Sequence, residues 1–335
     1  MSKISVIGAG SWGIALAVLL DRNNHQVLVW SHRQSQIDEM REKRTSDKLK
    51  DVILPDSLSF TGDLKEAVTS SDVLVIAVPS SATRETAEKI KDFVSKDQTI
   101  VTVSKGIEED TLMTQTEILA NVLGPDTKIC VLSGPSHAEE VVLFKPTLVV
   151  AGSEDRETAL FVQNLFMNEY FRVYSSPDVK GIEVGAALKN VIALAAGMSD
   201  GLGFGDNAKA ALITRGIKEI SSLAVAMGGQ AETLAGLTGV GDLIVTCQSL
   251  HSRNRMAGFY MGQGMTRQEA TEKVSMVVEG VYSAKAAKKL AMKYHIEMPI
   301  VDAVNAVLFD DMPAKEAVGF LMNRSKKDEL NVLEW

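Results

Sequence analysis

The sequence has few cysteines and no excess of basic residues. It contains two cysteines among 335 residues, Cys130 and Cys247, and their placement fits neither a disulfide framework nor a zinc motif. The five histidines are scattered without the spacing of metal ligands. A formal net charge of -8 argues against a nucleic-acid surface and against a basic face for anionic lipid. We therefore expect a reduced, cytoplasmic protein that holds no metal and binds no nucleic acid.

The sequence also lacks an apolar run suited to crossing a membrane. Residues 4–20, ISVIGAGSWGIALAVLL, carry no charge, but three glycines interrupt them. The run ends in Asp21 and Arg22 and not in a small-residue cleavage site, which argues against a signal peptide. A later apolar segment, residues 186–198, contains Lys189 and Asn190 and is too short to span a bilayer. We expect no stable membrane insertion.

Hydrophobic residues are nevertheless abundant, at 45% of the chain, enough for a large core divided into roughly two domains. Up to about residue 175, short β-branched runs such as SDVLVIAVPS alternate with helical patterns. This alternation predicts an α/β domain over residues 1–178, a doubly wound, mostly parallel sheet with helices on both faces. Beyond Asp178, segments rich in Ala, Met and Leu at helical spacing predict an all-helical domain over residues 179–335.

A glycine-rich turn follows the first predicted strand. Gly8, Gly10 and Gly13 have the G-x-G-x-x-G spacing, and the first helix is expected to begin at Gly13. The backbone N–H groups of Ser11, Trp12 and Gly13 would point at a ligand, and the helix N-terminus, with about half a positive charge, suits a pyrophosphate. The alternative is a turn needed only for packing the helix on the strand. The strand and helix on either side favour a dinucleotide site.

The end of the second predicted strand bears on the choice of cofactor. An acidic residue about 20 residues after the glycines would bind the ribose hydroxyls of NAD, but the sequence has His32 and Arg33 here and no carboxylate until Asp38. Arg33, assisted by His32, could pair with the 2′-phosphate of NADP. The alternative is a solvated arginine in a first helical turn. NADP is the favoured cofactor, and NAD remains open.

Polar turns follow three further predicted strands, at Pro79-Ser80-Ser81, Ser104-Lys105-Gly106 and Ser133-Gly134-Pro135-Ser136. Because the carboxyl ends of parallel strands lie along one edge of an open sheet, these turns should meet where ligands bind. Lys105 is therefore expected to face a cofactor or substrate, although alone it could be a surface lysine.

The helical half contains an isolated lysine in an apolar segment. Lys189 lies within AALKNVIALAAG, whose all-round apolar pattern predicts a buried helix. A buried ammonium needs an anionic partner, a lowered pKa or both, and such a lysine suits proton transfer near neutral pH. The alternative is a lysine that extends to a helix end and pairs with Glu183 or Asp200. The pattern does not decide between the two.

A second polar group lies further along the helical half. Asp242 follows a Gly-rich turn and could hold a lysine ammonium or a substrate hydroxyl. Ser252, Arg253 and Asn254 begin the next helical stretch, where they could form a small phosphate site; the alternative is a Ser N-cap followed by solvated arginines. The pattern alone predicts that Glu279 is a capping carboxylate.

The chain resembles bacterial NAD(P)-dependent glycerol-3-phosphate dehydrogenases over essentially its full length. Several separate motifs carry the resemblance in the family's order: GAGSWG at 8–13, VSKGIE at 103–108, LSGPS at 132–136, ALKNVIALAAG at 187–197, NAKAALITRG at 207–216, TGVGDL at 238–243, HSRNR at 251–255 and VEG at 278–280. His137 departs from the family, in which this position is often aromatic and apolar, and this affects the packing of the nicotinamide.

The resemblance implies a Rossmann-type domain followed by a helical domain, usually in a homodimer. It implies that the chain interconverts dihydroxyacetone phosphate and sn-glycerol 3-phosphate and so supplies phospholipid synthesis. Lys189 would be the general acid/base. The implied substrate contacts are Lys105, Gly134, Ser136, Lys189, Asn190, Asp242, Thr246, Ser252, Arg253 and Asn254. The implied cofactor contacts are Gly8, Gly10, Ser11, Trp12, Gly13, His32, Arg33, Lys105, Ala138, Arg253, Val277 and Glu279.

Two other functions remain possible on the sequence. A related two-domain dehydrogenase for a hydroxy acid or sugar acid would share the glycine turn and the catalytic lysine, but it would prefer a carboxylate substrate. A non-catalytic nucleotide sensor would keep the glycines without needing a buried lysine beside an anion site. A requirement for phosphate on the substrate would distinguish a glycerol-3-phosphate dehydrogenase from the hydroxy-acid or sugar-acid dehydrogenase. Turnover of a ketone would distinguish it from the sensor.

Overall fold

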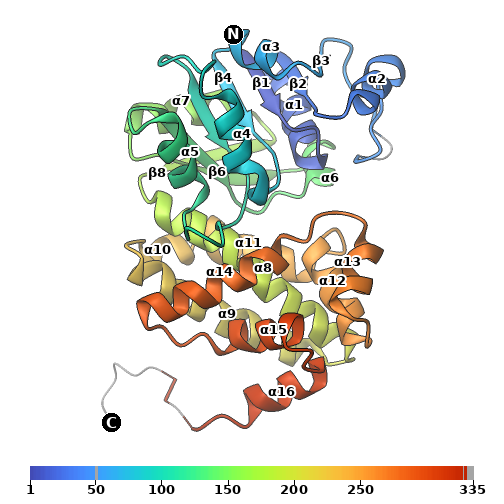
Figure 1. Ribbon diagram of the computed structural model, residues 1–335, viewed down its shortest axis with the longest axis vertical. Helices are drawn as coiled ribbons and strands as arrows, with labels where there is room; N and C mark the ends of the chain where they lie inside the picture. The colour runs from blue at the N-terminus through green and yellow to red at the C-terminus, as the bar shows by residue number, and fades with distance from the viewer. Residues whose placement is uncertain (50–51, 327, 330–335) are drawn as a thin grey trace.

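The computed structural model describes residues 1–49, 52–326 and 328–329, and it has two halves (Figure 1). The N-terminal half contains an eight-stranded sheet in the order β3-β2-β1-β4-β5-β6-β7-β8. The strands are β1 Lys3–Ile7, β2 Gln26–Trp30, β3 Ser59–Thr61, β4 Val73–Ile76, β5 Thr99–Thr102, β6 Lys128–Ser133, β7 Thr147–Gly152 and β8 Phe171–Ser176. All neighbours pair in parallel except β6 and β7. The predicted Rossmann-type, mostly parallel sheet is confirmed.

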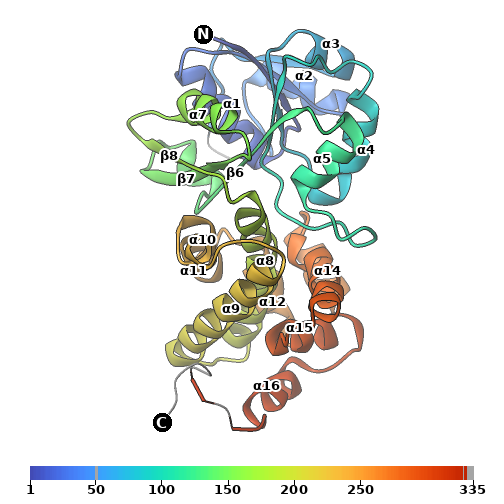
Figure 2. The same ribbon diagram turned by 90° about the vertical axis from the view of Figure 1, so that its left-hand side faces the viewer.

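Helices cover both faces of this sheet, because successive side chains of a strand point to opposite faces. In β4, Val73 and Val75 join the core under α1 and α7, whereas Leu74 and Ile76 join the core under α3, α4 and α5. Figure 2 shows the two helix layers on either side of the strands. The helices of this half are α1 Ser11–Arg22, α2 Gln34–Lys43, α3 Leu64–Thr69, α4 Thr83–Ile90, α5 Gln115–Leu123, α6 Ala138–Val141 and α7 Arg156–Phe166, with a short 3₁₀ turn at Ser80–Ala82.

The C-terminal half is built of helices and has no β-strand among its described residues, as predicted. Its α-helices are α8 Val179–Gly201, α9 Asp206–Ala226, α10 Ala231–Leu234, α11 Asp242–Gln248, α12 Arg253–Gly262, α13 Arg267–Val274, α14 Glu279–Tyr294, α15 Pro299–Phe309 and α16 Ala314–Met322, and a π-helical turn spans Leu237–Gly241. Helix α8 is the axis of this half, with α9, α11, α12 and α14 packed around it. Its apolar pattern therefore reflects burial on every side.

Helix α8 also corrects an argument made from the sequence. The apolar segment extends into a 23-residue helix, which is long and apolar enough to cross a membrane, so its length does not exclude a span. The most apolar stretch of this helix is 100% buried inside the protein. Such burial is what the core helix of a globular protein requires.

Two strand features differ from the sequence-based expectation. The pattern gave no sign of β3, because a three-residue strand with Ser59 and Thr61 on either side of Phe60 is too short to show periodicity. Strand β7 runs antiparallel to β6, and Val131 pairs with Gly152. Strand direction is set by the connection between strands and leaves no mark on an apolar run.

Candidate active site

A cavity of about 430 Å³ lies between the sheet and the helical half. It is lined by the turns after β1, β2, β4, β5 and β6 and, from the other half, by α8, α11, α12 and the residues that lead into α14. Most residues singled out from the sequence line it: Gly8, Gly10, Ser11, Trp12, Gly13, His32, Arg33, Lys105, Ser136, Ala138, Lys189, Asn190, Thr246, Ser252, Arg253, Asn254, Val277 and Glu279. Gly134 and Asp242 lie behind this lining and contact it through Lys105.

The glycine turn forms a cradle at one end of the cavity. Gly8 has a φ of +122°, and a Cβ there would approach the Ala77 carbonyl oxygen to 2.6 Å. A Cβ on Gly13 would collide with the Gly8 carbonyl oxygen, whereas one on Gly10 would meet nothing within 4 Å. The first and third glycines thus serve the turn and the packing of α1, and the second leaves the backbone open to a ligand.

The start of α1 fits an anionic ligand. The helix begins at Ser11, two residues before the start expected at Gly13, so its unpaired N–H groups directly follow the open Gly10. The indole Nε1 of Trp12 is buried and has no hydrogen-bond partner among the described residues. Open backbone, free N–H groups and an orphaned buried donor are what a dinucleotide pyrophosphate would fill.

A buried glutamine fixes the end of β2 against this cradle. Gln36 donates from Nε2 to the Ala9 carbonyl oxygen at 2.7 Å, and its Oε1 accepts from Ser31 Oγ at 2.8 Å. Arg33 and His32, both exposed, follow at the cavity mouth. Lys48 lines the same region. Lys48 was not predicted as a site residue, because nothing in the sequence of its loop shows that the chain returns to the cavity mouth.

The centre of the cavity holds two lysines that share one carboxylate. Lys189 Nζ lies 2.5 Å from Asp242 Oδ1, and Lys105 Nζ lies 2.8 Å from Oδ2. Lys189 also donates to Thr246 Oγ1 at 2.9 Å, and Lys105 donates to the Gly134 carbonyl oxygen at 3.1 Å. Exposed fractions of 6% for Lys189 and 1% for Asp242 leave little room for solvent to screen these charges.

These contacts set the acid strength of Lys189. Burial lowers its pKa to about 8, with Lys105 acting in the same direction and the Asp242 carboxylate opposing both. Burial alone would raise the pKa of Asp242, but the two lysines hold it below its usual range, so the carboxylate stays charged. An ammonium that titrates near neutral pH can give and take a proton.

The structure decides between the alternatives left open for Lys189. Its partner is Asp242 and not Glu183 or Asp200. Glu183 accepts hydrogen bonds from Thr116 in the other half, and Asp200 pairs with Arg255 at 2.7 Å. Lys189 is thus held inside the cavity, where it can act on a ligand.

Polar groups on α8 and α12 form the far end of the cavity. Asn254 donates from Nδ2 to Asn190 Oδ1 at 2.9 Å, and its own Oδ1 accepts from the Gly280 N–H at 2.8 Å. Ser252 is the N-cap of α12, as one alternative held, and accepts from the Arg255 N–H at 3.2 Å. This cap leaves the first N–H groups of α12 free beside Arg253. The N-cap at Ser252 therefore does not exclude a phosphate site at the start of α12.

Glu279 corrects the expectation drawn from its helix position. It is the first residue of α14, but its carboxylate does not cap that helix. It accepts from the Ser80 backbone N–H at 3.0 Å and from the Ser80 hydroxyl, across the cavity from its own half. Burial raises the pKa of Glu279, while these two hydrogen bonds oppose the rise. The residue links the two sides of the cavity.

Two imidazoles lie near the lysine pair. His137 and His251 line the cavity with ring centroids 5.8 Å apart. Burial lowers the pKa of His137, and the charge of Lys189 lowers it further. A neutral imidazole therefore lies beside the lysine pair. Among residues 1–49, 52–326 and 328–329, no cluster of three or more His, Cys, Asp or Glu side chains could hold a metal ion.

Comparisons with known proteins agree across the whole chain. A model described as NAD-dependent glycerol-3-phosphate dehydrogenase N-terminus matches residues 3–159, and one described as the C-terminus of the same family matches residues 178–319. A glycerol-3-phosphate dehydrogenase [NAD(P)+] from Agathobacter rectalis is 59% identical, with 100% of both chains covered. One from Fusobacterium nucleatum is 55% identical, covering 98% of this chain and 99% of the relative.

A solved structure gives the same match in three dimensions. Glycerol-3-phosphate dehydrogenase from Coxiella burnetii superposes with a TM-score of 0.93 at 36% sequence identity. The alignment covers 96% of this chain and 99% of that one. Both halves and the cavity between them therefore lie within the region of similarity.

Proposed function

The chain belongs to the NAD-dependent glycerol-3-phosphate dehydrogenase family, and we propose that its cavity interconverts dihydroxyacetone phosphate and sn-glycerol 3-phosphate. The observation that carries this proposal is the buried cluster of Lys189, Asp242 and Lys105 in one cavity with the open glycine cradle. The cluster can exchange a proton and the cradle can hold NAD(P). A non-catalytic sensor would need only the cradle.

Cofactor recognition follows the two ends of the cradle. The turn from Gly8 to Gly13 and the N–H groups of α1 would bind the pyrophosphate, and Arg33 and His32 would meet the adenosine end. The position of Arg33 favours NADP, while NAD remains compatible with the site. When bound, the reduced nicotinamide supplies a hydride.

Lys189 is the proposed general acid and base. In the reductive direction its ammonium gives a proton to the alkoxide oxygen that develops at C2 of the ketone. The neutral amine then remains beside Asp242, whose charge stays balanced by Lys105. In the reverse direction the neutral amine takes the proton from the C2 hydroxyl.

Other residues orient the substrate and stabilise charge. Lys105 and Asn190 would face the reacting oxygen, where fixed donors in a site of low dielectric have their largest effect. Arg253, Ser252 and Asn254 would hold the phosphate with the first N–H groups of α12. Binding energy from the unreactive phosphate end then positions C2.

The cellular role of the enzyme is part of the same proposal. The product sn-glycerol 3-phosphate would supply phospholipid synthesis in the cytoplasm. We further propose a homodimer. Light scattering coupled to size exclusion tests this point, since a dimer has about twice the 36.2 kDa of one chain.

A single assay tests the reaction. Absorbance of the reduced nicotinamide is followed with the purified protein, dihydroxyacetone phosphate, and NADPH or NADH in parallel, with unphosphorylated dihydroxyacetone as the control. We expect oxidation that requires the phosphate and is faster with NADPH. Oxidation with a hydroxy or keto acid only, or cofactor binding without turnover of any ketone, would contradict the proposal.

A further inference from the structure

We propose that Gln115 and Glu108 are positioning residues that hold the Lys105 ammonium against Asp242. Neither residue lines the cavity or touches Lys189, so they would act through the loop at residues 103–114 that leads from β5 to α5. This inference rests on the proposed function for its kinetic part, and on contacts within the chain for the rest.

Gln115 holds the carbonyl of Gly106, the residue directly after Lys105. Its side chain is 1% exposed, although it is the first residue of α5. Nε2 donates to the Gly106 carbonyl oxygen at 3.0 Å, and Oε1 accepts from Thr83 Oγ1 at 2.5 Å. A buried amide with both ends paired tolerates little displacement, because either end would lose its partner. Gly106 is therefore anchored to α5 and, through Thr83, to α4.

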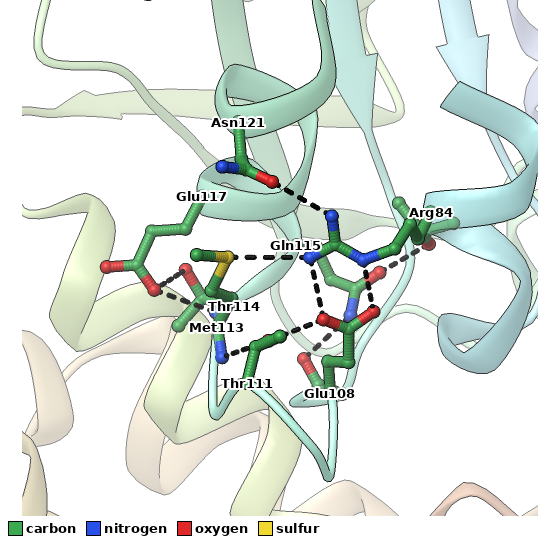
Figure 3. A network of polar contacts seen from close by, with 10 residues as sticks. Arg84, Glu108, Thr111, Met113, Thr114, Gln115, Glu117 and Asn121 are labelled. Carbon is green, nitrogen blue, oxygen red and sulfur yellow. Dashed lines mark hydrogen bonds and ion pairs between the residues drawn. The ribbon is translucent and has the colours of Figure 1, made fainter. Parts of the chain in front are cut away.

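Glu108 provides the second anchor, two residues further on. Its carboxylate accepts from Arg84 Nε at 2.8 Å and from the terminal Nη2 at 2.7 Å, and Arg84 also donates to Asn121 Oδ1 at 2.9 Å. Figure 3 shows the guanidinium of Arg84 between Glu108 and Asn121, with Gln115 directly behind. The two-point pairing fixes direction as well as distance. Within the loop, the Glu108 N–H donates to the Met113 carbonyl oxygen at 3.0 Å.

Gly106 also packs closely against Ser80. A Cβ added to Gly106 would collide with the side chain of Ser80, the residue bound to Glu279. The loop thus contacts α5, α4 and Ser80, which lies in the 3₁₀ turn directly before α4. Lys105, directly before Gly106, is presented to Asp242 by a peptide that cannot shift freely.

The position of Lys105 bears on Lys189 through Asp242. The charged and titratable groups that interact with Lys189 are Asp242, Lys105, His137 and Cys247. Lys105 is a like charge that shares the only carboxylate among them. If Lys105 withdrew, repulsion would weaken and Asp242 would serve Lys189 alone, so the ammonium of Lys189 would become harder to deprotonate.

The test uses Glu108→Gln and Gln115→Met, with Glu85→Gln as the matched control. Glu85 is also a glutamate paired with a cation, Lys89 on the same helix α4, and its loss makes the same change in charge. Removing the Glu108 charge by itself would ease deprotonation of Lys189, the opposite of the effect of Lys105 withdrawal. The direction of the change in the pKa of Lys189 therefore distinguishes a charge effect from a positioning effect. Because Gln115 is fully buried, Glu108→Gln keeps the test valid if Gln115→Met does not fold.

Two measurements are made. In protein labelled with ¹³C at lysine Cε, the Lys189 resonance is assigned through Lys189→Arg and titrated in the absence of ligand. We expect its pKa to rise by about half a pH unit or more in both variants and to be unchanged in Glu85→Gln. The KM for dihydroxyacetone phosphate should rise about tenfold in both variants.

A titration and a KM like those of the wild type in folded variants would overturn the inference. The titration needs no turnover, so it decides the positioning role even if the wild-type protein fails to reduce dihydroxyacetone phosphate. Such a failure would contradict the proposed function alone.

Discussion

At the scale of single residues, the site depends on a shared carboxylate. Two ammonium groups on one buried Asp242 leave an excess positive charge. The pKa of Lys189 is therefore set by burial and Lys105, which lower it, and by Asp242, which raises it. If Asp242 were paired only with Lys189, the Lys189 ammonium would hold its proton more tightly. The second lysine thus makes the first a better acid.

Replacement of Lys189 by alanine should lower kcat by about three orders of magnitude, because the alkoxide loses its proton donor. Binding of NADPH, followed by fluorescence titration, should survive. Lys180→Ala, at a lysine of the same helix that pairs with Glu117, is the control and should leave kcat unchanged. A variant at Lys189 with near-normal kcat would remove this residue from the mechanism.

The pH dependence of the wild type follows from the same pKa of about 8. Reduction needs the ammonium, so its rate should fall as pH rises through this value. Oxidation of sn-glycerol 3-phosphate needs the neutral amine, so its rate should rise over the same range. If the rates of reduction and oxidation both rose or both fell with pH through this value, Lys189 would not be the general acid and base.

Arg33 should distinguish the two cofactors. If its guanidinium pairs with a 2′-phosphate, Arg33→Gln should raise the KM for NADPH about tenfold and leave the KM for NADH within about twofold. Equal changes for both cofactors would mean that Arg33 stacks on adenine without reading the phosphate. Steady-state kinetics with each cofactor in turn provide the measurement.

At the scale of elements, α8 and α12 approach so closely that their backbones touch. A Cβ on Gly197 would collide with the Arg255 carbonyl oxygen, and one on Gly258 would collide with that of Leu194. This crossing places Lys189 and Asn190 beside Ser252 and Arg253 at the start of α12. Small residues here bring the proposed proton donor close to the proposed phosphate site.

Gly197→Ala should therefore lower the free energy of unfolding by about 1 to 3 kcal/mol, since the helices must separate. Gly319→Ala, in the interior of α16 with nothing within 4 Å of an added Cβ, is the matched control. There the helix propensity of alanine should stabilise by about 0.5 to 1 kcal/mol. Urea denaturation measures both, and a neutral Gly197→Ala would show that the crossing can relax.

A buried carboxylate of α9, that of Glu219, binds the N-terminus of α15 and should make stability depend on pH. Glu219 accepts from the Ile300 N–H at 2.8 Å and from the Val301 N–H at 3.3 Å. Burial raises its pKa from the ordinary 4.5 to about 7, with the two hydrogen bonds opposing. The folded state thus binds the proton more tightly than the unfolded chain does.

The contribution of Glu219 to stability is present in full below pH 4.5 and is lost as pH rises toward 7. Between pH 5.5 and 7.5 the wild type should lose about 1 to 2 kcal/mol on this account. Glu219→Gln should flatten this part of the profile. Denaturation at several pH values checks it, and an equally steep profile in the variant would assign the slope to other groups.

At the scale of the whole molecule, buried polar contacts join the two halves. Glu183 on α8 accepts from the Thr116 backbone N–H at 2.9 Å and from the Thr116 hydroxyl at 2.5 Å. Burial raises the pKa of Glu183, and the Thr116 contacts oppose that rise. Glu279 with Ser80 makes a second link at the cavity itself. The junction that carries the site is therefore held by directional hydrogen bonds.

Thr116→Val should destabilise the protein by about 1 to 3 kcal/mol, because the buried carboxylate of Glu183 loses a donor. Differential scanning calorimetry should show a lower Tm and a wider separation between the unfolding of the two halves. Thr271→Val, at an exposed threonine of α13, is the control. An unchanged Tm in Thr116→Val would mean that the contacts between Thr116 and Glu183 do not stabilise the junction.

The sequence determined most of the architecture. Apolar runs bounded by turn residues locate the longer strands, because a strand covered on both faces needs continuous hydrophobicity. The G-x-G-x-x-G spacing identifies the cradle, since its backbone geometry excludes side chains at Gly8 and Gly13. The three-residue β3 and the antiparallel direction of β7 left no such pattern.

The tertiary structure alone decided which charges meet. The sequence left open whether Lys189 pairs with Glu183 or Asp200 near the ends of its own helix, and whether Glu279 caps α14. The fold instead brings Asp242 to Lys189 from 53 residues away and Ser80 to Glu279 from 199 residues away. Local pattern reports burial and periodicity, which neighbours in the chain determine, whereas a buried charge takes its partner from the element packed against it.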